Sequence, residues 1–332
     1  MPVSLYHPVA VGGVELPGNL FLAPVAGYSD AAFRSICFGL GADLCYTEMV
    51  SSEALTRAHP KTTTLMDRAG NETRYAIQLF GSKPETLAKA ALMAAERGPT
   101  FIDLNCGCPV PKIVRAGSGS ALMKRPDLVY AIVGAMTGAL GPGGPPVTVK
   151  IRSGWDETSV NYLDVAQAAI EGGAKAITLH ARTRAQEYAG KADWSRIADL
   201  VGRVSVPVFG SGDVTEPEDA ERMVAETGCA GVMIARGAMG NPFIFRRARA
   251  VMEGRLDEAP TIRERVTAAR THLELSVGFL GERTACVEFR KQFCSYTRGA
   301  LGGAELRAAG VKASTISEFE AIFLRWGGMA ED

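Results

Sequence analysis

Short apolar runs alternate with amphipathic stretches along most of the chain. Each run has the length of a strand that is buried on both faces of a parallel sheet. The eight runs cover residues 19–25, 43–48, 74–80, 100–105, 146–151, 176–180, 206–210 and 231–235. Helical periodicity lies between them, including residues 30–40, 84–97, 126–139, 159–171 and 216–227. Eight β–α units at this spacing predict an α/β fold with a closed (β/α)8 TIM barrel, and an open doubly wound sheet is the alternative.

The alternation stops after Ala235, and from about Ala259 onward the pattern is helical without a convincing strand. Three or four amphipathic helices are expected there, over residues 261–280, 283–299 and 314–326. We therefore predict two domains, a catalytic barrel over residues 1–253 and a C-terminal all-α helical bundle over residues 254–332.

The length of 332 residues fits one barrel, which needs about 250 residues, and a small second domain. Lys plus Arg and Asp plus Glu both total 36, so net charge gives no support for a nucleic-acid partner. Any RNA-binding surface must then be local. No apolar run approaches the roughly 18 residues of a membrane span, and the start MPVSLYHPVA lacks a signal-peptide pattern. We expect a cytoplasmic protein that binds no membrane.

The chain contains seven cysteines, and an odd number without a secretion signal argues against a disulfide framework. Only Cys106 and Cys108 lie close together, and no second pair or nearby histidine completes a set of metal ligands. We expect no metal site.

Polar residues lie at or near the ends of four consecutive predicted strands. They are Gln78, Asn105 with Cys108 just beyond it, Lys150 and His180. Active sites of barrel enzymes lie at the C-terminal ends of the strands. One such residue is often only structural, but four neighbouring strands with polar ends predict a reaction site at one mouth.

The loops after predicted strands seven and eight carry Ser211, Gly212 and Asp213, then Ala235 and Arg236. These two loops are the usual phosphate site of such barrels, and glycine lets the backbone approach a phosphate. A plain tight turn explains the first loop equally well, but Arg236 in the second adds a cation for the phosphate.

A phosphate site beside a mouth with Gln and Lys suits flavin mononucleotide (FMN) lying across the barrel. Lys150 is then expected beside the pyrimidine edge of the flavin, where reduction builds negative charge. Gln78 is expected to hydrogen-bond the same ring. The turn Pro24-Val25-Ala26 is expected to supply close backbone contact.

Four segments carry a resemblance to a known family. They are LAPVAGYSD at residues 22–30, NCGCPVPKIVRAGSGSALM at 105–123, HART at 180–183 and ARGAMGNPFIF at 235–245. With these motifs the sequence resembles the tRNA-dihydrouridine synthases, especially the bacterial B-type branch, over almost its whole length.

The resemblance implies an FMN barrel that takes electrons from NADPH, with NADH as the alternative, and that acts on a uridine of folded tRNA. The family's acid cysteine falls on Cys108. Its flavin contacts fall on Pro24, Val25, Ala26, Gln78, Lys150, Ser211, Gly212, Asp213, Ala235 and Arg236, and we add His180.

Two flavin positions depart from the family pattern. Ser211 stands where the family often has Asn, and Ala235 where it often has Gly. Both side chains are small, so we expect altered FMN affinity rather than lost binding. Cys106 is also unusual in its place; it is interpreted as a small buried thiol, with a redox partner for Cys108 as the alternative.

Reduction of the uracil 5,6 double bond needs a hydride at C6 and a proton at C5. A thiol with a pKa of about 8.5 stays protonated near neutrality, so Cys108 is the predicted acid. Lys150 and His180 are expected to stabilise charge that develops on a uracil carbonyl. Asn105 is assigned to substrate binding. Arg152 and Arg182 are candidates for contact with a neighbouring RNA phosphate.

The helical extension combines basic and aromatic residues over 289–298. We predict RNA contacts by Arg290, Lys291 and Arg298, after the target uridine has been flipped into the mouth. The alternative is that Phe289 and Phe293 belong to a core and that the basic residues form a solvated face.

Other functions stay open at this point. The same chemistry on a uridine of ribosomal RNA differs only in distant surfaces. A flavin-dependent dehydrogenase of a small free pyrimidine has no need of the helical extension. A catalytically silent RNA-binding or chaperone protein has no need of Cys108, Lys150 and His180 together. We expect a monomer that does not bind DNA.

Overall fold

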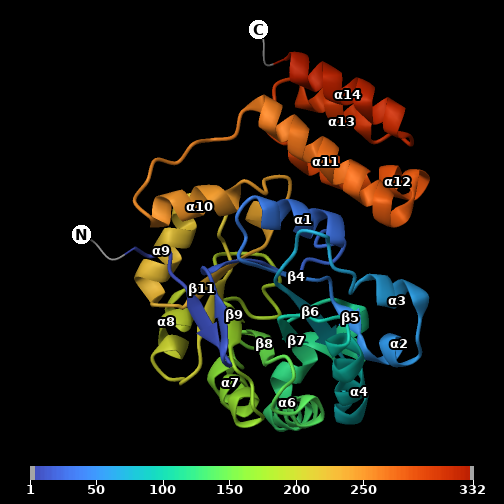
Figure 1. Ribbon diagram of the computed structural model, residues 1–332. Coiled ribbons are helices and arrows are strands. Elements are labelled where there is room, and N and C mark those ends of the chain that lie inside the picture. Colours follow the sequence, from blue (N-terminus) through green and yellow to red (C-terminus); the bar gives the residue numbers. More distant parts are fainter. Residues whose placement is uncertain (1–3, 330–332) are drawn as a thin grey trace.

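The computed structural model describes residues 4–329, and its centre is a closed ring of eight parallel strands (Figure 1). The ring closes because β3 pairs with both β4 and β11 and β4 pairs with β6. Its strands are β3 (Leu20–Leu22), β4 (Leu44–Tyr46), β6 (Tyr75–Phe80), β7 (Phe101–Cys106), β8 (Val147–Arg152), β9 (Ile177–His180), β10 (Val208–Ser211) and β11 (Gly231–Ile234). The short β5 (Val50–Ser51) adds to β6. The predicted TIM barrel is therefore confirmed.

Helices surround the ring, and their starts follow local sequence. The Asp30 carboxylate caps the first helix, and proline occupies the first turn of α4, α6 and α9. The helices are α1 (Ala31–Gly39), α2 (Ser52–Thr56), α3 (Pro60–Thr64), α4 (Pro84–Ala95), α5 (Pro111–Arg115), α6 (Pro126–Leu140), α7 (Tyr162–Glu171), α8 (Ser195–Val201), α9 (Pro217–Thr227) and α10 (Ile244–Met252). Short 3-10 helices are η1 (Gly119–Lys124) and η2 (Arg236–Ala238).

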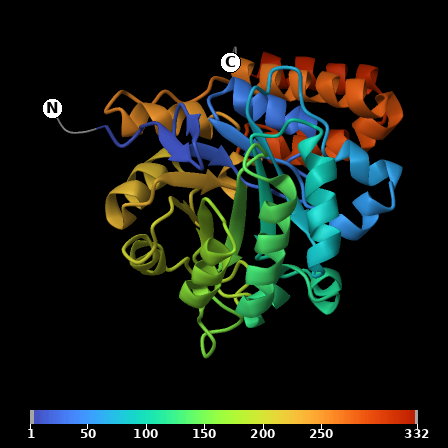
Figure 2. The same cartoon turned by 60° about the horizontal axis from the view of Figure 1, so that its bottom comes forward.

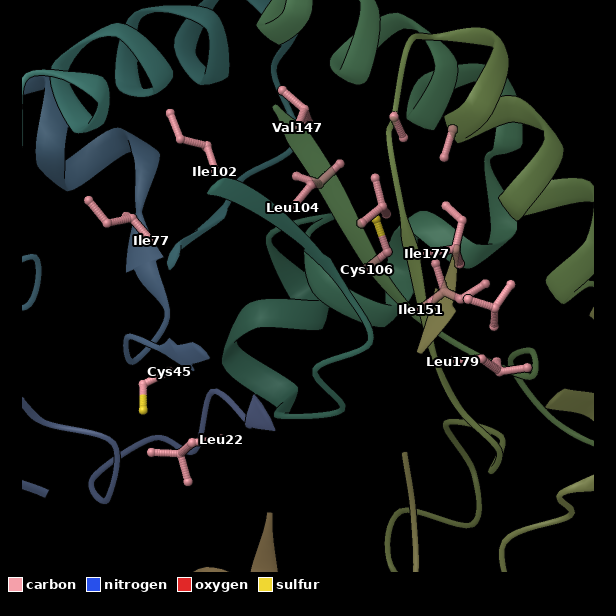
Figure 3. Packing of buried hydrophobic residues seen from close by; sticks show 14 of the residues in the cluster. Leu22, Cys45, Ile77, Ile102, Leu104, Cys106, Val147, Ile151, Ile177 and Leu179 are labelled. Atoms are coloured by element: carbon pink, nitrogen blue, oxygen red, sulfur yellow. The ribbon is translucent and has the colours of Figure 1, made fainter. Parts of the chain in front are cut away.

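Alternate residues of each barrel strand point outward and build the core between strands and helices. On β7 these are Ile102, Leu104 and Cys106, which belong to the same cluster as Ile151 of β8 (Figure 3). Both faces of each strand are covered, which explains why the runs read as nearly continuous apolar sequence. The position of Cys106 in this core fits its interpretation as a small buried thiol.

The residues between them point inward and change character along the barrel axis. Phe21, Phe101 and Phe209 fill the N-terminal end, where Phe21 meets Phe209 edge to face. A hairpin of β1 (Val9–Val11) and β2 (Val14–Leu16) contributes to the same apolar cluster. Farther along the strands the inward positions become polar, so the C-terminal mouth is lined by groups that can do chemistry.

The C-terminal part forms four helices, α11 (Ile262–Leu280), α12 (Glu282–Tyr296), α13 (Gly303–Gly310) and α14 (Ile316–Gly328). Phe289 and Phe293 lie inside their shared apolar core, as the alternative interpretation held. The same core includes Ile36 of α1 and Phe243, so these helices pack directly on the barrel. Figures 1 and 2 show them on the side that carries α1. The proposed domain boundary at residues 253–254 lies between α10 and α11.

Within residues 4–329, no helix combines the length and the apolarity needed to cross a membrane.

Gly240 supplies a test of how the helical unit packs on the barrel. Its φ is +72°, and a Cβ there would overlap the Ser295 carbonyl group of α12. Gly254 has a similar φ of +69° but no atom within 4 Å of its Cβ position. Gly254→Ala should cost about 1 kcal/mol of unfolding free energy from the left-handed backbone alone. Gly240→Ala should cost about 1–3 kcal/mol more, because the close contact is with backbone.

Urea denaturation of the two variants measures this difference. Equal unfolding free energies would contradict the tight packing of Gly240 against α12.

Candidate active site

A cavity of about 350 Å³ opens at the C-terminal mouth of the barrel. This volume lies in the range of small-molecule and cofactor sites. Most of the residues assigned to the site from sequence line it. They are Pro24, Val25, Ala26, Asn105, Cys108, Lys150, Arg152, His180, Ser211, Gly212, Asp213, Ala235 and Arg236.

The loop that carries Cys108 is held from both sides. The Asn105 amide oxygen accepts the backbone N–H groups of Gly107 at 3.1 Å and Cys108 at 2.9 Å. Arg152 Nε donates to the Gly107 carbonyl at 2.8 Å, and the Ser120 N–H donates to the Cys108 carbonyl at 3.0 Å. These bonds fix the direction in which the thiol enters the cavity.

Asn105 and Arg152 were both expected to contact substrate, but the structure commits their polar groups elsewhere. The Asn105 amide nitrogen donates to Gln78 and to the Met49 sulfur. Arg152 is 2% exposed and also donates to the carbonyls of Thr183 and Glu187. Both side chains therefore position the Cys108 loop. Within residues 4–329, only Nη2 of the Arg152 guanidinium is left without a hydrogen-bond partner, and it lies at the cavity wall.

The Cys108 thiol faces the cavity with 8% of the residue exposed. Burial raises its pKa above the ordinary value, and this outweighs the opposing effects of the Val110 backbone and the Arg152 cation. The thiol is therefore protonated at neutral pH, which suits a proton donor rather than a nucleophile.

Lys150 and His180 point into the cavity from the adjacent strands β8 and β9, where Lys150 is in register with Thr178 and His180 with Arg152. Burial, with a further effect of Arg152, lowers the pKa of Lys150 to about 8. Burial and the nearby Lys150 cation hold the pKa of His180 well below its usual value, so its imidazole is neutral. Arg182 Nη1 lies 3.4 Å from His180 Nε2. Since guanidinium is always a donor, this contact assigns the imidazole proton to Nδ1.

The loops after β10 and β11 leave backbone donors at the cavity. In the described part of the chain the N–H groups of Gly212 and Asp213 have no hydrogen-bond partner. Gly212 has a φ of +119°, and a Cβ there would lie 2.8 Å from the Ala192 Cβ. Only glycine fits this turn. Free N–H groups beside the exposed Arg236 form a donor set that can hold a phosphate.

The Asp213 side chain points to cations rather than to the expected phosphate. Its carboxylate accepts from Arg182 at 2.7 Å and from Arg236 at 3.2 Å. Partial burial raises the pKa of Asp213, but the hydrogen bond from the Ala192 N–H and the two guanidinium groups outweigh it, so the pKa is lowered. Asp213 can therefore serve a phosphate through its backbone N–H, while its side chain orients Arg236.

Arg182 and Gln78 lie behind the cavity wall. Arg182 is 1% exposed and donates to Asp213 and to the Ala189 and Gly190 carbonyls, a position that does not match the expected contact with an RNA phosphate. Gln78 has no exposed surface, and its amide bonds Asp103 and Asn105. Both polar atoms of the Gln78 amide are therefore already hydrogen-bonded, and neither is free for the expected contact with a flavin ring.

Tyr188 is a wall residue that the sequence did not single out. It lies in the loop after β9 and is 55% exposed. Arg152 Cζ and Arg236 Cζ lie 5.7 and 5.4 Å from its ring centroid, and His180 stands 6.5 Å away. An exposed aromatic between two cations at a pocket mouth can stack on a planar ligand.

A second hollow lies where α12 meets the loop after β3. Lys291 and Arg298 line it together with Tyr28 and Arg307. Arg290 does not, because its guanidinium bonds the carbonyls of α13–α14 connection residues 312 and 313. The structure thus brings two of the three predicted RNA contacts together and separates the third from them.

Over residues 4–329, no cluster of three or more His, Cys, Asp or Glu side chains could hold a metal ion.

Comparisons with known proteins agree on the type of protein. The sequence profile described as "Dihydrouridine synthase (Dus)" matches residues 21–325. The chain is 48% identical over 326 residues to a "Probable tRNA-dihydrouridine synthase" of Treponema pallidum, covering 96% of each chain. It is 36% identical to the "tRNA-dihydrouridine synthase B" of Pseudomonas putida, covering 90% of this chain and 88% of the relative.

Among solved structures, the fold is similar to that of a 2-naphthoyl-CoA reductase, with a TM-score of 0.58 and 13% identity over 76% of this chain and 52% of the other. It is also similar to morphinone reductase, with a TM-score of 0.53 and 14% identity over 79% of this chain and 92% of the other. At these identities the likeness concerns the fold alone.

The raised pKa of Cys108 predicts slow alkylation by iodoacetamide. Only the thiolate attacks the reagent, so the rate at Cys108 should keep rising above pH 9, where an ordinary thiol levels off. Peptide mass spectrometry from pH 7 to 10.5, with glutathione in the same tube as reference, measures the profile. If the alkylation rate at Cys108 stops rising at the same pH as that of glutathione, or at a lower pH, the thiolate is stabilised and the protonated state is contradicted.

Proposed function

Because this chain belongs to the dihydrouridine synthase family, an oxidoreductase family acting on CH–CH bonds, we propose that it reduces the 5,6 double bond of specific uridines in tRNA. The observation that carries the proposal is the buried Cys108 thiol on the wall of a cavity that is also lined by Lys150, Arg152 and Arg236. Such a cavity suits an anionic cofactor and a substrate that needs a proton.

FMN is the proposed cofactor, and the residues present fit it. The free N–H groups of Gly212 and Asp213, with Arg236, would hold its phosphate. Lys150 would lie at the edge of the ring system, and the backbone of residues 24–26, in the loop after β3, would contact it. Bound FMN in its reduced form supplies the hydride for C6 of uracil. The small side chains of Ser211 and Ala235 leave room for the phosphate, and altered affinity stays a prediction.

Cys108 would deliver the proton to C5. Burial keeps the thiol protonated, and the two bonds from Asn105 with the one from Arg152 hold its loop while the proton is transferred. Lys150 as a cation, and His180 through Nδ1–H, would stabilise negative charge on a uracil carbonyl, and both residues line the cavity. No His–Asp relay is required, because the acid begins in its protonated form.

The cavity lies in the mouth of the barrel, so a uridine in folded RNA must be flipped in. Tyr188 at the rim would stack on the flipped base, and Lys291 with Arg298 would contact RNA phosphates beside the mouth. The names of the relatives favour tRNA over ribosomal RNA. We further propose that NADPH is the electron source, with NADH as the alternative. We also propose that the protein is cytoplasmic and monomeric.

The rival function is reduction or oxidation of a small free pyrimidine. Purified protein loaded with FMN and NADPH should add 2 Da to uridines of unmodified tRNA transcripts, which nuclease digestion and mass spectrometry detect. Ribosomal RNA fragments, uridine, uracil and dihydroorotate in parallel reactions show whether the helical unit selects folded tRNA. Turnover of a free pyrimidine without turnover of tRNA would refute the proposed substrate.

Cys108→Ala should keep FMN binding and NADPH oxidation but lose dihydrouridine formation about 10²–10⁴-fold, the usual contribution of a general acid. Cys106→Ala removes the same atom from the neighbouring core position and is the matched control. It should retain activity. Full activity of Cys108→Ala, or equal losses in both variants, would contradict the acid assignment.

A further inference from the structure

We propose that Asp103 is a positioning residue for the proton-donating loop and that it acts on Cys108 through Gln78 and Asn105. The inference rests on the proposed function. Asp103 accepts from the Gln78 amide nitrogen at 2.7 Å, and the Gln78 amide oxygen accepts from Asn105 at 2.8 Å. Asn105 in turn holds the N–H groups of Gly107 and Cys108.

The backbone N–H groups of the Cys108 loop fix the donor and the acceptor of every hydrogen bond in this series. Backbone N–H groups can only donate, so the Asn105 oxygen must face Gly107 and Cys108. The Asn105 nitrogen then faces Gln78, which must present its oxygen, and the Gln78 nitrogen is left facing Asp103. The residue at position 103 must therefore be an acceptor.

Asp103, at the other end of this series of hydrogen bonds, is also held in place. Thr148 Oγ1 donates to the second oxygen of Asp103 at 2.6 Å, and Asp103 has no exposed surface. Gln78 and Thr148 stand directly beside Asp103 in the register of β6, β7 and β8. The chain thus ties three strands to one loop.

Packing at this buried position does not by itself require a hydrogen-bond acceptor. An unpaired buried carboxylate is costly, and burial raises the pKa of Asp103 to about 7 although Thr148, Gln78 and Lys150 oppose the shift. Without an acceptor at 103, the Gln78 amide loses its partner or turns over. A turned amide would reverse Asn105 and present N–H groups to the backbone N–H groups of the Cys108 loop. The loop would be released, and proton transfer would lose its geometry.

Two variants of Asp103 separate this role from a structural one. Asp103→Leu removes the acceptor, whereas Asp103→Asn keeps one oxygen for Gln78 and can donate to the Thr148 hydroxyl, which rotates. Thr178→Val is the control, because Thr178 is a buried inward residue of β9 whose hydroxyl has no partner within residues 4–329. FMN content and NADPH-driven flavin reduction report one half-reaction, and single-turnover formation of dihydrouridine by the reduced enzyme reports the other.

Asp103→Leu should slow the second half-reaction about 10²-fold, as expected for a misplacement of about 1 Å, and leave the first within about twofold. Asp103→Asn and Thr178→Val should stay near wild type. Equal slowing of both half-reactions by Asp103→Leu, no slowing, or failure of Asp103→Asn to rescue would overturn the inference. If Asp103→Leu does not fold, Gln78→Leu removes the next residue of the hydrogen-bond series. It should slow the second half-reaction to the same extent and leave the first unchanged.

Alkylation of Cys108 by iodoacetamide, without RNA, tests the loop independently of the reaction. Asp103→Leu should change the rate at Cys108 severalfold, and Asp103→Asn should not. A wild-type enzyme that forms no dihydrouridine refutes the proposed function, whereas an unchanged alkylation rate in Asp103→Leu overturns this inference.

Discussion

Side chains alternate between the two faces of each barrel strand, and this two-residue repeat decides which groups reach the cavity. On β7 it sends Asp103 and Asn105 inward, while Leu104 and Cys106 enter the outer core. Cys108 lies beyond the end of β7, where the alternation of side chains no longer applies. Hydrogen bonds must therefore fix the direction of its side chain. Asn105, at the last inward position of β7, supplies two of them. The chemistry of the mouth thus depends on the register of the strands below it.

Burial disfavours the charged form of the ionisable groups at the mouth, which suits the proposed acid Cys108 but opposes the cationic form of Lys150. It raises the pKa of the Cys108 thiol, which keeps its proton, and lowers the pKa of Lys150 to about 8. His180 remains neutral for the same reason. An anionic ligand beside Lys150 would favour its protonated form, so cofactor binding and a cationic Lys150 support each other. The cavity is therefore prepared for a negative ligand and an acid-dependent step.

The sequence predicted the eight barrel strands, five of the surrounding helices and three of the four C-terminal helices, because long periodic segments carry a strong signal. Short elements such as α2, α5 and the β1–β2 hairpin were missed, although Gly12-Gly13 between the short runs Val9–Val11 and Val14–Leu16 is a hairpin signal. Most of the predicted site residues line the cavity because strand ends converge in a barrel. Their partners were not predicted, since pairing such as that of Arg182 with Asp213 depends on contacts between distant loops. Tyr188 lacked any strand-end signal.

Mapping dihydrouridine in the cellular RNA of a strain that lacks this gene tests tRNA reduction by Cys108 in its natural setting. Specific dihydrouridines should disappear from tRNA and remain in ribosomal RNA. A plasmid copy of the wild-type gene should restore them, and a copy carrying Cys108→Ala at equal protein level should not. An unchanged set of tRNA dihydrouridines in the deletion strain, or full restoration by the Cys108→Ala copy, would contradict the proposed reaction.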